Sequence, residues 1–330
     1  MKVAKVRVEA PARLHMGFLD LHGGLGRRFG SIGLCLEDIG TVLEAVPAPE
    51  VSASGPSARL AQLNAEKLLA ELEAGTGVKI TVQDAIPEHA GLGSGTQMAM
   101  AVGAAVNRLL GLDHTTRELS LLLKRGRRSG IGIGTFSAGG FILDGGHSED
   151  TLIPPVLLQL PIPDTWRFIL VLDSDRCGLS GRDEVCAFKD LPPMEEAMAG
   201  DICRHVLMQA LPAIREDDCA AFGSAISAVQ AMNGEYFSTA QGGQYTSQAV
   251  AEAVHFLQQH GATGGGQSSW GPTGFAIFAN ETAAWQALRQ ARKFLLGDSP
   301  VELKLCRARN TPAVVDAMAA GGAVLGSAKR

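Results

Sequence analysis

The chain of 330 residues lacks a surplus of basic side chains, because 29 Lys and Arg face 34 Asp and Glu and the formal net charge is −5. Proteins that hold a nucleic-acid backbone normally carry such a surplus, so we expect no nucleic-acid partner. No apolar run approaches the ~20 residues that span a bilayer, so we expect no membrane partner. The six cysteines form no Cys-x-x-Cys pair and no zinc-like spacing with histidine, which indicates reduced thiols and a cytoplasmic protein.

Standard motifs of nucleotide and ester chemistry are also missing from the glycine-rich loop at residues 91–97. The loop lacks the Gly-Lys-Ser/Thr of a Walker A sequence, and its Gly-Leu-Gly-Ser-Gly run is not a Gly-x-Gly-x-x-Gly fingerprint. Ser94 is flanked two positions away by Leu92 and Thr96, so it is not the nucleophile of a Gly-x-Ser-x-Gly elbow. These absences disfavour a nicotinamide-binding fold and a serine hydrolase.

Glycine, in contrast, is abundant: there are 40, where an average usage of roughly 7% predicts about 23. Four windows, at residues 17–33, 91–95, 126–146 and 261–274, contain 23 of these glycines. Glycine is favoured where the backbone adopts a positive φ or must approach another group closely. The windows therefore indicate functional loops or sites of close approach.

The periodicity of apolar residues predicts an α+β fold. Hydrophobic residues make up 46% of the chain, enough for a sizeable core. Strand-like alternation at residues 1–9, ending at Pro11, and at 78–82 is mixed with helical spacing at 60–72 and 98–110. Because helices and strands do not alternate regularly, we expect α+β layers rather than a doubly wound parallel sheet.

A proline-rich segment divides the chain into two predicted domains. Residues 151–164 carry four of the 15 prolines, and we take them as the connection between residues 1–155 and residues 156–330. The second half is predicted to form strands at 168–172, 275–278 and 301–305 and helices at 194–211, 217–232, 247–259 and 282–295.

The strongest local signal is the strand, glycine loop and helix between residues 78 and 110. A helix N-terminus preceded by glycines exposes backbone N–H groups, and the helix dipole adds positive charge, so a phosphate can bind there. Ser94 and Thr96 add hydroxyls that can donate hydrogen bonds or ligate a metal. The alternative is a tight turn with a serine helix cap. The predicted phosphate-binding residues are Gly91, Leu92, Gly93, Ser94, Gly95, Thr96 and Gln97.

The first glycine window gathers charged and titratable side chains that suit anion chemistry. Guanidinium groups recognise carboxylates and phosphates, which makes the arginines candidate clamps. Asp20 is a candidate magnesium ligand, and a turn-forming aspartate is an equally good interpretation. His15 as a hydrogen-bonded strand residue, and solvated arginines, are the corresponding structural alternatives. The predicted catalytic residues are Arg13, His15, Asp20, Arg27 and Arg28.

The last window is dense in turn formers and side-chain donors that precede a strand. Its candidate substrate-binding residues are Gln267, Ser268, Ser269 and Trp270. Trp270 is able to pack on an aromatic or sugar ring, although a tryptophan beside Gly-Pro more often covers the edge of the core.

Three of these segments, at residues 11–36, 87–97 and 264–274, resemble in order the three motifs of the galactokinase, homoserine kinase and mevalonate kinase (GHMP) superfamily. The sequence is more similar to a non-kinase branch, the β-ribofuranosylaminobenzene 5′-phosphate synthases. That similarity rests on Ser-Gly-Ile-Gly at 129–132 and above all on Gln-Ser-Ser-Trp-Gly-Pro-Thr at 267–273.

The resemblance implies a two-domain GHMP-kinase-like fold. Its N-terminal βαβ-type domain would carry the phosphate loop at residues 87–97, and its C-terminal domain would be a ferredoxin-like α/β sandwich. It implies a Mg²⁺-assisted reaction in which phosphoribosyl diphosphate and 4-aminobenzoate or 4-hydroxybenzoate form a C-riboside, releasing CO₂ and diphosphate in tetrahydromethanopterin biosynthesis. It also implies a homodimer, with Ser94 and Thr96 as candidate metal ligands.

Two departures from the kinase pattern separate the chain from its phosphorylating relatives. Where kinases with a catalytic aspartate read Ser-Gly-x-Asp, this chain has Gly132, and where their phosphate loop usually has a second serine, it has Gly95. The base that would activate an acceptor hydroxyl is therefore missing. An ATP-dependent small-molecule kinase acting on a homoserine- or mevalonate-like alcohol, and a silent protein that only binds a phosphorylated metabolite, are the alternatives.

Overall fold

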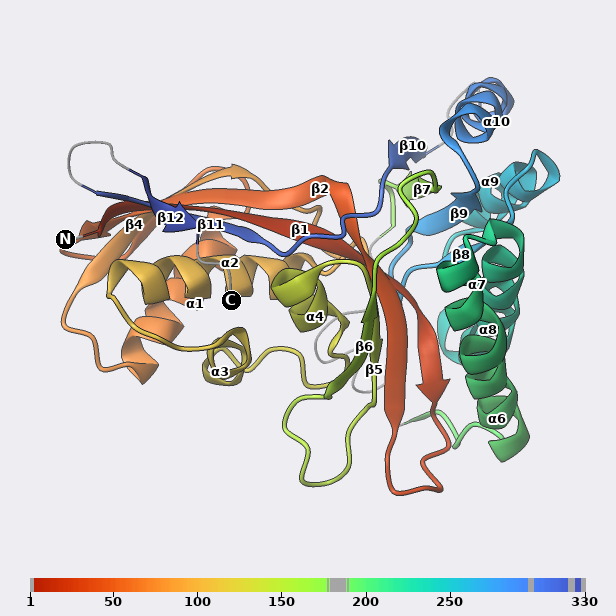
Figure 1. Cartoon of the computed structure of the whole chain (residues 1–330), viewed down its shortest axis with the longest axis horizontal. Helices are drawn as coiled ribbons and strands as arrows, with labels where there is room; N and C mark the ends of the chain where they lie inside the picture. Colours follow the sequence, from red (N-terminus) through yellow and green to blue (C-terminus); the bar gives the residue numbers. More distant parts are fainter. Residues whose placement is uncertain are drawn as a thin grey trace.

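The computed structural model describes residues 3–176, 178, 188, 190–295, 300–319 and 324–327. In this part of the chain a large mixed sheet occupies one half of the molecule, and a smaller sheet covered by helices occupies the other (Figure 1). The large sheet has the order β12-β11-β1-β2-β4-β3, and β5 and β6 extend it from β2. Its strands are β1 (Val3–Asp20), β2 (Phe29–Ala48), β3 (Ser52–Ser54), β4 (Gly77–Asp84), β5 (Phe141–Asp144), β6 (Val156–Leu160), β11 (Val314–Ala319) and β12 (Val324–Ser327).

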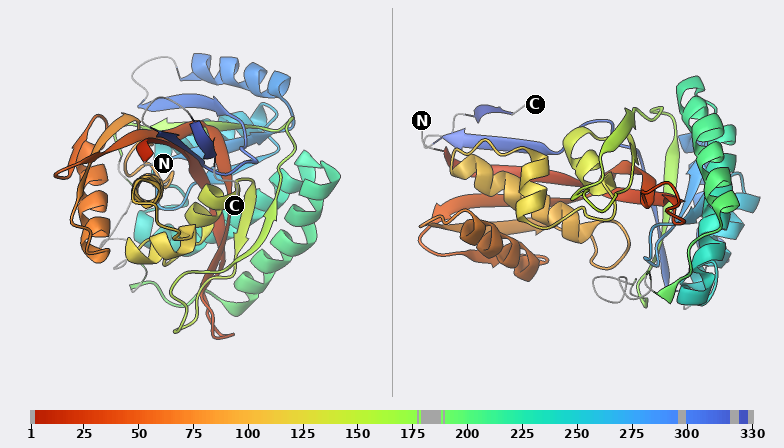
Figure 2. Two further views of the ribbon diagram at one scale, coloured as in Figure 1. Left: turned by 60° about the vertical axis from the view of Figure 1, so that its left-hand side comes forward. Right: turned by 90° about the horizontal axis from the view of Figure 1, so that it is seen from below.

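Strand β1 continues well beyond the strand predicted at residues 1–9. The side chains at every even position from Val6 to Phe18 are buried, which is the period-two pattern of a strand with one face on the core. The predicted end at Pro11 is wrong because the pairing with β2 shifts register between Pro11 and Arg13, and proline is tolerated at such a bulge. The β1–β2 hairpin therefore reaches the helices of the second half (Figure 2, right).

Four helices accompany the large sheet: α1 (Ala58–Glu71), α2 (Ser94–Leu109), α3 (Thr116–Leu122) and α4 (Ile131–Ala138). Strand β3, helix α1 and strand β4 form a βαβ unit with parallel strands, as expected for the N-terminal half. Helix α3 begins with a capping box formed by Thr115 and Glu118. Helix α2 is buried against β1 and β2 and brings its N-terminus to the middle of the molecule (Figure 1).

The second half confirms the ferredoxin-like topology. Its antiparallel sheet has the order β10-β7-β9-β8, formed by β7 (Arg167–Asp173), β8 (Gly264–Gln267), β9 (Gly274–Phe278) and β10 (Val301–Cys306). The helices are α6 (Glu196–His205), the π-helix η1 (Val206–Ala210), α7 (Leu211–Glu216), α8 (Cys219–Gln241), α9 (Gln248–Gln259) and α10 (Glu281–Phe294). The predicted helices at 194–211 and 217–232 thus correspond to a helical run broken by η1 and α7 and to a longer α8.

Strands from both sides of the boundary predicted between residues 155 and 156 pair with each other in the large sheet. Strand β6 pairs with β5, and β11 crosses back to pair with β1 in the large sheet. One hydrophobic core also joins Leu14 and Leu34 of the first half to Trp166 and Phe222 of the second. The two halves therefore share a core.

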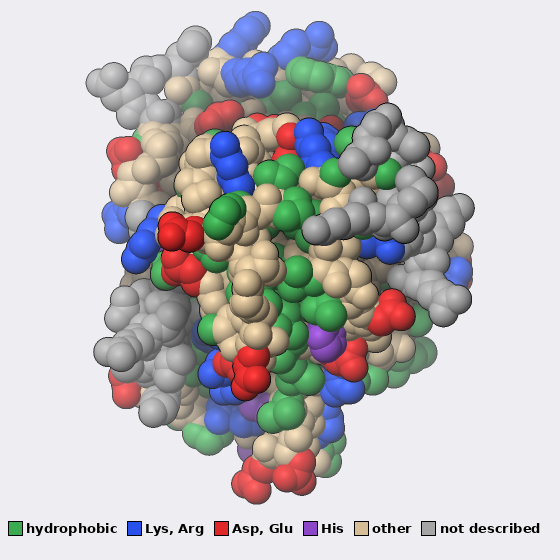
Figure 3. All heavy atoms as spheres, turned by 90° about the vertical axis from the view of Figure 1, so that its left-hand side faces the viewer, with side chains coloured by type: hydrophobic (Ala, Val, Ile, Leu, Met, Phe, Trp, Pro, Cys, Tyr) green, Lys and Arg blue, Asp and Glu red, His purple; other side chains and the backbone are tan. Residues whose placement is uncertain are grey.

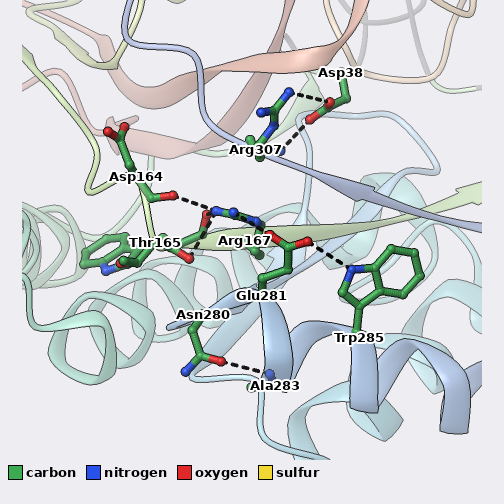
Figure 4. A network of polar contacts seen from close by, with 10 residues as sticks. Asp38, Asp164, Thr165, Arg167, Asn280, Glu281, Ala283, Trp285 and Arg307 are labelled. Atoms are coloured by element: carbon green, nitrogen blue, oxygen red, sulfur yellow. Dashed lines mark hydrogen bonds and ion pairs between the residues drawn. The ribbon is translucent and has the colours of Figure 1, made fainter.

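A polar network ties the start of β7 to helix α10 (Figure 4). Arg167 donates through Nη2 to Glu281 at 2.7 Å and through Nη1 to the carbonyl oxygen of Asp164 at 2.6 Å. Trp285 donates to the other oxygen of the Glu281 carboxylate, and Asn280 caps the helix. These contacts fix α10 against the sheet, away from the glycine windows.

The outer surface shows no concentration of one charge on the face drawn in Figure 3. Basic and acidic side chains are interspersed there around an irregular strip of hydrophobic side chains (Figure 3). None of the helices in the described part of the chain is both long and apolar enough to cross a membrane.

Candidate active site

The predicted phosphate loop forms an open helix N-terminus. Gly91 and Gly93 have φ values of 80° and 82°, which glycine adopts readily, and helix α2 begins at Ser94. Within the described part of the chain, the N–H groups of Ser94 and Gly95 and the hydroxyl of Ser94 make no hydrogen bond. Unpartnered N–H groups at a helix N-terminus attract an anion.

Arg13 lies directly against this loop. Its backbone N–H donates to the carbonyl oxygen of Leu92 at 3.1 Å, and its Nη1 donates to that of Gly91 at 2.6 Å. A Cβ atom at Gly93 would lie 2.8 Å from Arg13 Cγ, so the glycine is required for this packing. The arginine therefore supports the loop and supplies positive charge beside it.

Arg125, which follows helix α3, lies at the same helix N-terminus. Its Nη1 would be 3.5 Å from a Cβ atom at Gly95. Burial lowers the pKa of its guanidinium, and it makes no ion pair with any described residue. Burial also lowers the pKa of nearby Lys67, and the charges of Lys124, Arg125 and Arg127 lower it further. Arg125 therefore brings a partly desolvated positive charge to the phosphate loop, with Lys67, Lys124 and Arg127 near it.

The third glycine window packs against the start of α2. Gln97 is fully buried and donates its side-chain amide to the carbonyl oxygen of Gly132 at 2.8 Å, so it braces α4. A Cβ atom at Gly132 would lie 3.0 Å from Thr96 Cγ2. A side chain at position 132 would therefore point toward the phosphate loop, in agreement with the interpretation of this position as the missing base.

Asp144, which the sequence did not single out, holds this window in place. Its carboxylate accepts hydrogen bonds from the backbone N–H groups of Gly130 and Gly146, both at 2.9 Å, and from the hydroxyls of Ser31 and Ser129. Burial raises the pKa of this carboxyl, although the four donors oppose the shift. One aspartate at the end of a short strand gives no sequence signal for such a role.

The last glycine window contributes a strand where a turn was predicted. Gly264, Gly265 and Gly266 belong to β8. A Cβ atom on Gly264 would collide with the backbone of Gly223, and one on Gly265 with the backbone of Phe275. A Cβ atom on Gly266 would collide with the side chain of Gln230. The three glycines therefore allow α8 and β9 to approach β8 closely. Because this close packing requires residues without a side chain, the glycines form a strand here despite their preference for turns.

Ser268 joins the last window to the first window and to the phosphate loop. Its hydroxyl donates to the carbonyl oxygen of Gly91 at 2.7 Å and accepts the backbone N–H of His15 at 3.1 Å. Three segments far apart in the sequence therefore meet at one fully buried side chain. The first and last windows are therefore in direct contact.

The remaining predicted residues of the last window face inward. Trp270 is buried and its ring lies 4.4 Å from that of Phe237, so it packs in the core and offers no open face for a sugar. Gln267 accepts from the backbone N–H of Thr246 and donates to Gln241. Ser269 lines the small cavity beside His15 and has a positive φ of 56°.

His15 is buried, and its imidazole packs against Phe18 with ring centroids 4.6 Å apart. Burial lowers the pKa of this histidine well below its usual value, and the charge of Arg13 lowers it further. The ring is therefore neutral at physiological pH. Its Nε2 atom has no hydrogen-bond partner among the residues that the structure describes.

Three predicted residues lie at the opposite end of the hairpin. Asp20 accepts the N–H groups of His22 and Gly23, both at 2.8 Å, and so forms a turn. Arg27 donates to the carbonyl oxygens of two glycines at 2.8 Å, and Arg28 donates to that of Leu21 at 3.1 Å. All three side chains therefore have partners at the tip of the hairpin, and Phe29, next to Arg28, packs through Phe18 toward His15.

The donor set near the loop limits how a metal ion can bind. No group of three or more His, Cys, Asp or Glu side chains in the described ranges has the arrangement of a metal centre. The hydroxyls of Ser94 and Thr96 are partly exposed and make no side-chain hydrogen bond with the described residues. They suit a Mg²⁺ ion that is bound mainly through substrate phosphates and water.

Comparison with known proteins identifies the fold and its relatives. The descriptions "GHMP kinases N terminal domain" and "GHMP kinases C terminal" match residues 59–140 and 210–296. The chain is 32% identical to a β-ribofuranosylphenol 5′-phosphate synthase of Archaeoglobus fulgidus over 82% of this chain and 87% of that protein. It is 30% identical to one of Methanothermobacter thermautotrophicus, covering 83% and 89% of the two chains. The mevalonate kinase structure of Methanococcus jannaschii superposes with a TM-score of 0.67 at 15% identity, over 92% and 98% of the two chains.

Proposed function

Because this chain belongs to the β-ribofuranosylphenol 5′-phosphate synthase family, within the GHMP fold, we propose that it joins phosphoribosyl diphosphate to 4-hydroxybenzoate. A carbon–carbon bond forms between ribose C1 and the ring carbon that carries the carboxylate, and CO₂ and diphosphate leave. The word phenol in the relatives' names favours the hydroxy acceptor over 4-aminobenzoate.

The observation that carries this proposal is the open N-terminus of α2. The N–H groups of Ser94 and Gly95, which have no partner among the described residues, form with the nearby Arg13 and Arg125 a site for a polyanion. Departure of diphosphate from ribose C1 develops negative charge on the leaving group, and preorganised donors stabilise that charge. The reaction needs no enzyme nucleophile, since the aromatic ring attacks the sugar directly.

Magnesium is part of the proposal. Mg²⁺ bound to the diphosphate would neutralise charge on the leaving group. The residues that would hold it are Ser94 and Thr96, whose hydroxyls have no other partner among the described residues. The protein's own contribution is to orient the diphosphate through the N–H groups of α2.

A kinase reaction has less support at this site. Gly132 lies beside Thr96 at the position where a kinase of this fold would carry an aspartate, and it has no side chain to accept a proton from an alcohol. Asp144, the buried carboxylate of the same window, is fully occupied by four hydrogen-bond donors. Among the described residues of this window, no carboxylate is available as the base.

Release of labelled CO₂ tests the proposed reaction. The protein is incubated with phosphoribosyl diphosphate, Mg²⁺ and 4-hydroxybenzoate carrying ¹⁴C in its carboxyl group, with a parallel reaction on 4-aminobenzoate. We expect labelled CO₂ and an equal amount of diphosphate, with the hydroxy acceptor preferred. Absence of CO₂ release with both acceptors refutes the proposal. A parallel assay with ATP and homoserine or mevalonate detects a kinase, and binding without turnover in all assays indicates a silent protein.

We also propose that the protein acts as a cytoplasmic homodimer in tetrahydromethanopterin biosynthesis. The four cysteines in the described part of the chain are free, in keeping with a reducing compartment. The dimer rests on family resemblance alone, and light scattering of the purified protein measures it directly.

A further inference from the structure

A small cavity lies between β1, β8 and α8. Its volume is about 20 Å³, which accommodates one water- or hydroxyl-sized group and no aromatic ring. The residues around it include His15, Phe18, Asn233, Phe237, Gln267 and Ser269. The wall is therefore part aromatic and part polar, and most of the polar groups are amides.

Two amides of the wall, those of Asn233 and Gln230, are already occupied by hydrogen bonds within the protein. Asn233 accepts the N–H of Phe18 at 2.8 Å and donates back to its carbonyl oxygen at 3.1 Å. Gln230 donates to the carbonyl oxygen of Met16 and accepts the N–H of Gln267, both at 2.7 Å. These bonds hold the amides in fixed orientations and leave them little capacity for a ligand.

His15 Nε2 is the exception. Among the described residues that line the cavity, His15 alone carries a buried side-chain polar atom, Nε2, without a hydrogen-bond partner. The side chain is only 2% exposed, so bulk water cannot satisfy it. A buried polar group without a partner is destabilising, which makes an unoccupied Nε2 a strong indication of a ligand contact.

The cavity is adjacent to the proposed diphosphate site. Ser268 Oγ accepts the backbone N–H of His15 and donates to Gly91 in the phosphate loop, so two hydrogen bonds connect them. Arg13, two residues before His15 on the same strand, donates to the same carbonyl oxygen of Gly91. An acceptor that reaches from the cavity toward the loop would therefore meet the reacting sugar.

We propose that His15 Nε2 binds the para-hydroxyl of the aromatic acceptor and takes its proton during carbon–carbon bond formation. This inference rests on the proposed function. The hydroxyl enters the cavity and the ring remains outside it. His15 is thereby assigned as a catalytic base, and the size of the cavity becomes the feature that selects the para substituent.

The proton balance of the step is complete. A pair of ring electrons forms the bond from the carboxylate-bearing carbon to ribose C1, and the C1–oxygen bond breaks with its electrons leaving on diphosphate. The ring becomes a cyclohexadienone as the hydroxyl proton moves to His15 Nε2. The bond to the carboxylate then breaks, CO₂ leaves, the electron pair restores the aromatic ring, and His15 returns the proton to the oxygen.

A weakly basic histidine suffices for this step. The hydroxyl becomes strongly acidic as the ring loses electrons to the new bond, so the proton transfers without a strong base. A buried imidazole beside Arg13 is kept neutral and is therefore ready to accept a proton when the substrate binds.

The first test replaces His15 with phenylalanine, which keeps a flat ring and removes Nε2. We expect kcat for CO₂ release from 4-hydroxybenzoate to fall by about 10²- to 10⁴-fold, the usual contribution of general base catalysis. The KM for phosphoribosyl diphosphate should change little. The matched control is His255→Phe at an exposed position on α9, which should keep wild-type turnover.

The acceptor 3,5-difluoro-4-hydroxybenzoate separates proton transfer from a packing defect. Its fluorines make the hydroxyl more acidic, so an already ionised acceptor needs no base. The ratio of wild-type to His15→Phe kcat should therefore be much smaller for this acceptor than for 4-hydroxybenzoate. Equal ratios for the two acceptors, or unchanged kcat in the variant, overturn the proposal and leave an ordered water as the occupant of the cavity.

A measurement on the wild-type protein keeps the proposal testable if the variant does not fold. Because the cavity has room for a hydroxyl and not for a methoxy group, 4-methoxybenzoate should compete with 4-hydroxybenzoate at least tenfold more weakly than unsubstituted benzoate does. Competition equal to or stronger than that of benzoate contradicts the assignment of the cavity. If the wild type releases no CO₂, the proposed function fails; if it is active and these results are negative, only this inference fails.

Discussion

The hydroxyl of Ser268 donates a 2.7 Å hydrogen bond to the carbonyl oxygen of Gly91, 177 positions earlier in the chain. Because the same hydroxyl accepts the N–H of His15, one buried side chain positions the phosphate loop relative to the first strand. Neither glycine-rich window can shift without breaking this contact. The two proposed substrate sites are therefore mechanically connected.

Replacing Ser268 with alanine should disturb both sites at once. It leaves the buried N–H of His15 without a partner, while the carbonyl oxygen of Gly91 keeps its hydrogen bond from Arg13, so we expect a loss of about 1–3 kcal/mol in the free energy of unfolding. We also expect kcat/KM for both substrates to fall. Ser238→Ala, which removes only a local bond to the carbonyl oxygen of Glu235, is the control. Equal denaturation midpoints and kinetics for the two variants would show that the Ser268 contact is unimportant.

Gly93→Ala tests whether the loop requires both its conformation and its contact with Arg13. The φ of 82° costs an alanine roughly 1–2 kcal/mol, and the new Cβ would lie 2.8 Å from Arg13 Cγ. Gly111 has a φ of 67°, and a Cβ atom added there would meet no described atom within 4 Å. Gly111→Ala therefore carries the backbone strain without the collision. We expect both variants to lose stability and only Gly93→Ala to lose affinity for phosphoribosyl diphosphate in calorimetry. Unchanged affinity would remove the loop from the diphosphate site.

The sequence was sufficient to predict the features that depend on local geometry. Positive φ at Gly91 and Gly93 and the helix that follows them are predicted from residue types at fixed spacing. The ferredoxin-like second domain came from family resemblance, and the strand order confirms it. Local rules and resemblance thus account for the main elements and for the phosphate loop.

The features that depend on tertiary contact could not be predicted in the same way. Gly264 to Gly266 read as a turn because the close approach of α8 is not encoded locally. The role of Asp144 requires four donors from separate segments. Arg27 and Arg28 share a glycine window with Arg13, and only the length of β1 shows that they lie at the hairpin tip while Arg13 lies within the strand.

Arg125→Ala should weaken binding of phosphoribosyl diphosphate without changing affinity for the aromatic acceptor. A hydrogen bond to a charged group contributes roughly 1.5–3 kcal/mol, so the KM for phosphoribosyl diphosphate should rise about 10- to 100-fold. Removal of a desolvated cation should leave the stability equal or slightly higher. Arg117→Ala, at an exposed position on α3, controls for the loss of one positive charge. Identical KM values for the two variants would exclude Arg125 from the site.

The lowered pKa of His15 predicts a specific pH dependence of stability. Its pKa is lowered in the folded state, first by burial and then by Arg13, so below pH 6.5 the unfolded chain binds a proton that the folded chain does not. The free energy of unfolding must therefore fall as the pH decreases through this range, with a slope approaching about 1.4 kcal/mol per pH unit from this residue. His15→Phe removes the group and with it this part of the slope.

Urea denaturation of the wild type and His15→Phe at several pH values between 5 and 7.5 measures this linkage. The stability difference between the two proteins should shift in favour of the variant as the pH falls, whereas His255→Phe retains His15 and should follow the wild type. Because the measurement requires no substrate, it tests the burial and neutrality of His15 independently of any activity. A pH-independent difference would mean that His15 is solvated in the folded protein, and a solvated imidazole could not serve as the unpartnered base proposed for the acceptor hydroxyl.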